Sequence, residues 1–277
     1  MALSERLKKG GLGRWLIAII LAIPATFAIF LENRLFLLAL VLLMGGIAWW
    51  EFAVNLFGKS RPGLLFISLL SWALVVLGTN YYSLEGLIGG LIVSIFFGAF
   101  YLMAILAPGK DTVTINLLSR YALGHIYLSL FLPFSLLIKT LDDGALLLFF
   151  VILVTTLADT GAIYAGTFFR GPKLFVKISP NKTFSGLAGG CAAAALVGGV
   201  MTAFLAEFSV KEGMLLGLSL ALTGALGDLF ESAIKRSVGV KDSSPFLLGH
   251  GGFWDRLDSL IFNFPLFYFY CYFKQLP

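Results

Sequence analysis

The stretch GALLLFFVILVTTLADTGAIYAGTFF (residues 144–169) decides the class of fold. It is apolar along its length and carries Asp159 as its single charge. Roughly 20 apolar residues are enough for a helix to cross the ~30 Å hydrocarbon core of a bilayer. A carboxylate within such a helix is costly unless it faces the bundle interior and a partner. The stretch therefore predicts a membrane-spanning helix whose carboxylate faces the interior of the bundle.

The rest of the chain repeats this apolar pattern. Of its 277 residues, 59% are hydrophobic and 13% are charged, and the mean hydropathy of +0.94 is far above that of soluble domains. We predict an all-α, polytopic integral membrane bundle of about nine transmembrane helices. They lie near 14–31, 35–57, 63–80, 84–107, 119–139, 144–169, 184–206, 212–234 and 257–274.

Lys and Arg predict the orientation, because cytoplasmic loops are enriched in them. The N-terminal segment and the loops after the second, fourth, sixth and eighth helices hold 16 of the 20 Lys and Arg residues. We therefore expect a cytoplasmic N-terminus and cytoplasmic loops at 170–183 and 235–256. The net charge of +5 follows from this topology and from attraction to anionic headgroups, so no nucleic-acid partner is expected.

The ionisable residues divide the chain in two. Residues 1–140 form predicted helices 1–5, with one acid that we expect to be buried, Glu51 in AWWEFAVN. We interpret Glu51 as the structural partner of a buried polar group, such as Asn55 or an Arg on a neighbouring helix, and this part as a scaffold with surface for oligomer contacts. Residues 141–277, predicted helices 6–9 with their cytoplasmic loops, carry most other intramembrane charges. We expect catalysis there.

Four carboxylates, Asp159, Asp228, Glu231 and Asp258, converge on one depth from the cytoplasmic side, and Asp255 lies at the surface one turn above Asp258. Lys235 marks the cytoplasmic end of its helix, and the acid seven residues earlier lies about 10 Å deep at 1.5 Å per residue. Oxygen ligands without Cys indicate a hard cation, Mg²⁺ before Zn²⁺, and a second cation is left open. The predicted metal ligands are Asp228, Asp255 and Asp258, with Asp159 and Glu231 as second choices.

Basic and glycine-rich segments surround these acids and suit phosphate groups. In SPNKTFSG (179–186) a Pro-Asn turn presents Lys182 just before a helix, whose free N–H groups bind anions. In GHGG (249–252) the glycines let the backbone approach a ligand closely. The predicted substrate-binding residues are Ser179, Asn181, Lys182, Thr183, Lys241, Asp242, His250, Gly251, Gly252 and Arg256.

Four motifs resemble the phosphatidate cytidylyltransferase (CDP-diacylglycerol synthase) family. They are LADTGAIYAG (157–166), SPNKTFSG (179–186), GALGDLFESAIKR (224–236) and SAIKRSVGVKDSSPFLLGHGGFWDRLDS (232–259). The resemblance implies that CTP and phosphatidic acid give CDP-diacylglycerol and pyrophosphate, with Mg²⁺ required. It also implies catalytic roles for Asp228, Lys235, Arg236, Asp255 and Asp258.

The expected setting is the bilayer of a bacterial inner membrane, with CTP entering from the cytoplasm and phosphatidic acid from the lipid. A homodimer is left open. Two rival interpretations remain: another lipid enzyme, such as a CTP-dependent polyprenol kinase or a prenyl-phosphate transferase, and a cation-coupled transporter with the buried acids as ion ligands. We find no internal repeat, which counts against the transporter.

Overall fold

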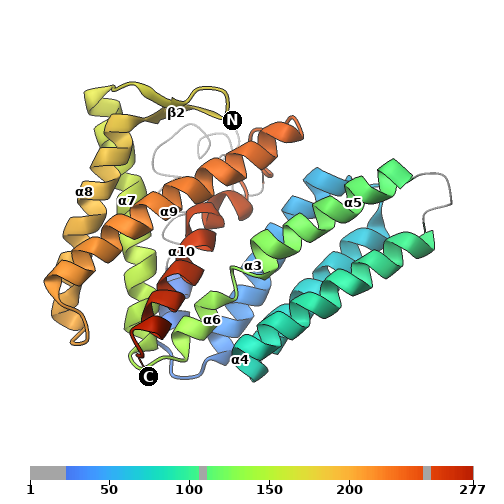
Figure 1. The fold of residues 1–277 in the computed structure, drawn as a ribbon, viewed down its shortest axis with the longest axis horizontal. Coiled ribbons are helices and arrows are strands. Elements are labelled where there is room, and N and C mark those ends of the chain that lie inside the picture. The colour runs from blue at the N-terminus through green and yellow to red at the C-terminus, as the bar shows by residue number, and fades with distance from the viewer. Residues whose placement is uncertain (1–22, 106–110, 246–250, 277) are drawn as a thin grey trace, which may run out of the picture. The chain divides into compact units, whose positions relative to one another are not determined.

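The computed structural model describes residues 23–105, 111–245 and 251–276, and helices dominate it (Figure 1). Predictions on the remaining residues, which include half of the first apolar stretch and His250, lie outside the described part. Six helical segments of the described chain are long and apolar enough to cross a membrane: Leu35–Phe57, Pro62–Ile105, Val113–Lys139, Gly144–Phe169, Phe184–Phe204 and Val210–Ser237. An all-α membrane protein is therefore confirmed, whereas the count of nine helices and the side of the N-terminus stay predictions.

The chain forms two compact units. One contains Met1–Leu137 and Asp242–Leu257, and the other contains Ile138–Lys241 and Asp258–Pro277. The first boundary falls close to the predicted division at residue 140. The segment 242–257, which we grouped with the catalytic helices, belongs to the unit of the N-terminal helices. Helix α10 (Trp254–Phe273) begins in one unit and continues in the other.

In the first unit, α3 (Leu35–Phe57) precedes a helical hairpin within α4 (Pro62–Ile105). The backbone leaves helical geometry at Tyr82 and at Ser83, where φ is +52°. A Cβ atom on Gly86 would overlap the carbonyl of Gly78, although residues eight apart lie about 12 Å apart along a straight helix. The chain therefore folds back here, as the break between the apolar stretches 63–80 and 84–107 predicts.

The apolar stretch predicted as one helix over 119–139 begins earlier and is interrupted. It starts as α5 (Asp111–Gly124), continues as the π-helical turn η1 (His125–Ser129), and resumes as α6 (Phe134–Lys139). Pro133, just before α6, has no N–H to donate to a preceding turn, and this accounts for the break.

In the second unit, α7 (Gly144–Phe169), α8 (Phe184–Met201) and α9 (Val210–Ser237) are its long helices (Figure 1). A short antiparallel hairpin, β1 (Lys173–Phe175) and β2 (Ser179–Thr183), connects α7 to α8. The Gly-rich run 186–199 lies in α8 and allows close contact with α7. A Cβ on Gly190 would lie 2.9 Å from the carbonyl oxygen of Ala158 in α7.

The same close packing joins α8 to α9 and gives a stability prediction. A Cβ on Gly217 would overlap the backbone carbonyl of Ala194, whereas a Cβ on Gly89 in α4 would meet nothing within 4 Å. Gly217→Ala should lower the free energy of unfolding by about 1–3 kcal/mol, because backbone must shift to admit the methyl group. Gly89→Ala is the matched control and should be neutral or stabilising. Thermal unfolding of both variants in detergent measures the difference. Equal shifts of the melting temperature would contradict close packing of α8 and α9 at Gly217.

Candidate active site

Three carboxylates meet where α9 and α10 pack, and we call them the carboxylate cluster: Asp228, Glu231 and Asp258. Each contributes one oxygen atom, and these oxygens lie within 4.8 Å of one another. Asp228 and Glu231 share a face of α9 because they are three residues apart. Asp258 reaches them because Gly227 has no side chain: a Cβ there would lie 2.5 Å from the carbonyl oxygen of Asp258.

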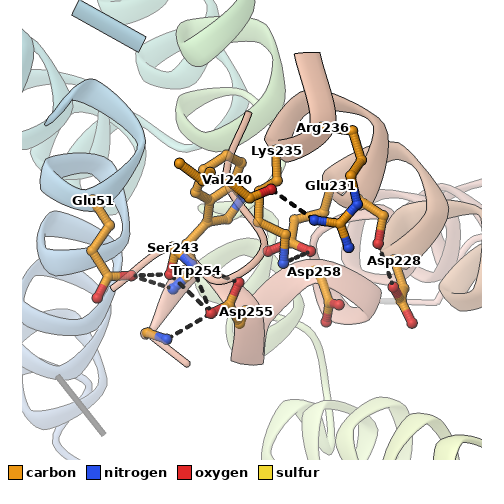
Figure 2. Close-up of polar contacts among 12 residues, drawn as sticks. Glu51, Asp228, Glu231, Lys235, Arg236, Val240, Ser243, Trp254, Asp255 and Asp258 are labelled. Atoms are coloured by element: carbon orange, nitrogen blue, oxygen red, sulfur yellow. Dashed lines mark hydrogen bonds and ion pairs between the residues drawn. The ribbon is translucent and has the colours of Figure 1, made fainter. Parts of the chain in front are cut away.

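Two lysines neutralise most of the charge of this cluster. Lys182 Nζ, from β2, lies 2.7 Å from Asp228 Oδ2, and Lys235 Nζ lies 2.6 Å from Glu231 Oε2 (Figure 2). The second pair is almost fully buried, with side chains 8% and 1% exposed. The first pair is accessible, at 22% and 33%. The cluster is therefore buried at Glu231 and partly exposed at Asp228.

The donor set of the cluster fits a hard divalent cation such as Mg²⁺. Its ligand atoms are carboxylate oxygens only, which Mg²⁺ and Ca²⁺ prefer over Zn²⁺. Three carboxylates face two ammonium groups here, and Asp159 of α7 adds a fourth carboxylate that interacts with Asp228 and Lys182. A divalent cation would offset this excess of negative charge and so allow a phosphate-bearing substrate to approach.

A chain of buried hydrogen bonds, which we call the polar ladder, joins α10 to α7 and α9, and the sequence analysis did not predict it. Asn263 of α10 is fully buried; its Nδ2 donates to Thr155 Oγ1 in α7 at 2.7 Å, and its Oδ1 accepts from Thr223 Oγ1 in α9. The ladder fixes α10 against both helices, five residues beyond Asp258. Asn263 could have been recognised because an amide inside an apolar helix needs a hydrogen-bond partner, as a buried carboxylate does.

Asp255, a predicted metal ligand, belongs to the other unit. Its Oδ2 accepts hydrogen bonds from Gly252 N at 2.7 Å and from the Ser243 hydroxyl at 3.0 Å. Gly251 has a φ of +75°, and a Cβ there would overlap the Asp255 carboxylate. These glycines thus let the backbone approach a carboxylate, and the metal role of Asp255 stays a prediction.

The other predicted site residues have these positions. Thr183 caps α8, because its hydroxyl accepts from Gly186 N at 3.0 Å. Arg236 Nη1 donates to the carbonyl of Val240 at 2.7 Å (Figure 2). Asp159 interacts electrostatically with Asp228 and Lys182 from α7. Ser179 and Asn181 flank Lys182 on β2, and exposed side chains are found at Arg236, Lys241, Asp242 and Arg256.

Fold and site together define an α-helical membrane protein with a cluster of carboxylates and lysines. Residues 13–274 match the cytidylyltransferase family, and the chain belongs to that family. It is 34% identical over 235 residues to a phosphatidate cytidylyltransferase of Bacillus subtilis, covering 83% of this chain and 86% of the relative. It is 43% identical over 135 residues to that of Staphylococcus saprophyticus, covering 48% and 52%. The resemblance drawn from the four motifs is thereby confirmed.

Proposed function

We propose that the protein transfers the cytidylyl group of CTP to phosphatidic acid, giving CDP-diacylglycerol and pyrophosphate. The observation that carries this function is the accessible Lys182–Asp228 pair at the edge of the carboxylate cluster. Membership of the cytidylyltransferase family supports it, as do relatives named phosphatidate cytidylyltransferase. The apolar helices place such an enzyme where its lipid substrate lies.

The reaction makes one bond and breaks one. A phosphate oxygen of phosphatidic acid attacks the α-phosphorus of CTP, and the bond to the bridging oxygen of the β-phosphate breaks, so pyrophosphate leaves. The attacking oxygen is already ionised at neutral pH, so no general base is required. The main barrier is the approach of two anions, and fixed positive charge lowers it. Mg²⁺, held by Asp228, Glu231 and Asp258, would supply part of that charge.

The two lysines of the cluster have different roles in this reaction, because their side chains differ in exposure. Lys182 can exchange Asp228 for an incoming phosphate oxygen, because both side chains are accessible. Lys235 keeps Glu231 oriented, because that pair is buried. Arg236, Lys241 and Arg256 are exposed, and we assign them to the remaining anionic groups of CTP and of the lipid. His250 is assigned to a hydrogen bond with phosphate or ribose.

The substrates also suggest the side of the membrane. CTP does not cross a bilayer and is supplied by the cytoplasm, whereas phosphatidic acid arrives within the bilayer. The distribution of Lys and Arg independently favours cytoplasmic loops at 170–183 and 235–256. We therefore propose an inner-membrane enzyme whose active site faces the cytoplasm.

A labelling experiment tests this orientation. Ser237, exposed at the end of α9, is outside the predicted site and can be replaced by Cys, with Cys191 and Cys271 changed to Ala. The Ser237→Cys thiol should react with a membrane-impermeant maleimide only after the cells are opened. Labelling in intact cells would overturn the orientation.

The proposed function is tested with purified protein in detergent. Pyrophosphate release from CTP should require phosphatidic acid and should not be supported by a polyprenol. Conversion of CTP to CDP with the polyprenol, without pyrophosphate release, would favour the rival lipid kinase. Absence of any CTP turnover with either lipid would favour the transporter. The lipid product should have the mass of CDP-diacylglycerol.

A further inference from the structure

We propose that Glu51 of α3 is a positioning residue that holds residues 242–245 and 251–257 together. The inference rests on the proposed function, because the segment 242–257 carries residues that we assign to CTP and metal binding. Glu51 lies 192 residues before Ser243, in the part of the chain that the sequence marked as scaffold. Its side chain is only 4% exposed.

The Glu51 carboxylate binds both described ends of the segment (Figure 2). On one side, Oε1 accepts from the Ser244 hydroxyl at 2.5 Å and Oε2 accepts from the Ser243 hydroxyl at 2.9 Å. On the other side, Oε2 accepts from Trp254 N, the first residue of α10, at 2.9 Å. One carboxylate therefore holds two stretches of chain that are ten residues apart, and it also caps the N-terminus of α10.

The residues next to Glu51 leave room for this contact and add to it. A Cβ on Gly252 would overlap both carboxylate oxygens of Glu51 and the Ser243 hydroxyl, so a side chain here would displace this contact. Asn55, one turn further along α3, donates from Nδ2 to the Ser243 carbonyl at 2.8 Å. The same amide donates to the Glu51 carbonyl at 2.8 Å. Glu51 and Asn55 thus fix one edge of the segment together.

Ser243 connects Glu51 to Asp255. Its hydroxyl lies 2.9 Å from Glu51 Oε2 and 3.0 Å from Asp255 Oδ2. The hydroxyl carries a single hydrogen and donates to one carboxylate at a time. Backbone groups bind each carboxylate as well: Trp254 N binds Glu51, and Gly252 N binds Asp255 at 2.7 Å. Glu51 therefore orders the residues that orient Asp255.

A direct ligand role for Glu51 fits these contacts less well. Both of its oxygens already accept hydrogen bonds from the protein, and the side chain is buried. A ligand would have to displace Ser243, Ser244 or the first turn of α10. Its effect on catalysis would instead act through the position of the segment, where a misplacement near 1 Å costs on the order of 10²-fold in rate.

The test compares Glu51→Ala and Glu51→Gln with Glu85→Gln, a control at an exposed glutamate of α4. For each full-length protein in detergent, hydrogen exchange of the peptides covering 242–245 and 251–257 is measured together with kcat and KM. Glu51→Ala should raise exchange in these peptides, leave α7–α9 unchanged, and lower kcat by roughly tenfold to a hundredfold. Glu51→Gln should lie between, because its amide keeps one oxygen acceptor. Glu85→Gln should match the wild type.

Three results would overturn the proposal. They are unchanged exchange of the segment in Glu51→Ala, exchange that rises equally through α3–α5, and unchanged kcat despite local opening. The second would make Glu51 a general packing residue. Because hydrogen exchange needs no substrate, its outcome is separate from the proposed function. A wild-type protein that does not act on CTP and phosphatidic acid would contradict the function and leave the exchange result to decide whether Glu51 holds the segment.

Discussion

Asp258→Asn is expected to lower turnover by about 10²–10³-fold or more, because it removes a charge from the carboxylate cluster while keeping the shape of the side chain. Asp228→Asn should behave alike. The two acids reach the cluster from different helices, α10 and α9, yet their oxygens lie within 4.8 Å of each other and of Glu231. Loss of either carboxylate should therefore also weaken binding of a divalent cation.

The measurement is turnover as a function of Mg²⁺ concentration, with Mn²⁺ binding followed by electron paramagnetic resonance as a readout independent of activity. Asp142→Asn, at an exposed position before α7, is the matched control and should leave both unchanged. Thermal unfolding establishes that the variants are folded. Near-normal turnover of Asp258→Asn at low Mg²⁺ would show that Asp258 is not a metal ligand.

Lys182→Ala is expected to raise KM or lower kcat by roughly 10²-fold, since a charge-assisted contact with a substrate phosphate is lost. Stability should change little. The Lys182–Asp228 pair is partly exposed, with side chains 22% and 33% accessible, and such pairs contribute about 0–1 kcal/mol. A large kinetic effect with a small stability effect separates substrate binding from folding.

Lys173→Ala supplies the control on the same hairpin. Lys173 of β1 is exposed and is paired in register with Thr183 of β2, and we assign it to the membrane surface. Steady-state kinetics should therefore change strongly for Lys182→Ala and little for Lys173→Ala. Unchanged kinetics of Lys182→Ala for both CTP and phosphatidic acid would remove Lys182 from the site.

Hydropathy and helix periodicity predicted the parts of this molecule that depend on local sequence. Helices α3 and α7 begin and end where the apolar stretches 35–57 and 144–169 do. Asp228 and Glu231 could be placed on one face because they are three residues apart, and Asp258 could be matched to them by depth along its helix. The structure brings these three together.

Contacts between distant residues could not be predicted in the same way. Glu51 binds Ser243 from 192 residues away, and Asn263 binds Thr155 from 108 residues away. Neither spacing leaves a periodic signal. We interpreted the Pro-Asn pair of SPNKTFSG as a turn, and this is wrong: Ser179–Thr183 form the strand β2, which pairs with the three-residue strand β1. Extended structure here depends on that pairing and not on an alternating pattern within the segment. The ion pair of Lys182 with Asp228 depends on that hairpin, and it also was not foreseen.

The central claim is that a cytidylyl group moves from CTP to phosphatidic acid, and the fate of each phosphate of CTP tests it most directly. Purified protein in detergent is given phosphatidic acid and Mg²⁺ with CTP that is radiolabelled at either the α- or the γ-phosphate. The proposed reaction predicts that the α-label enters the lipid fraction and that the γ-label appears in pyrophosphate. Transfer of the γ-label to lipid, or retention of both labels in CTP, would contradict the account.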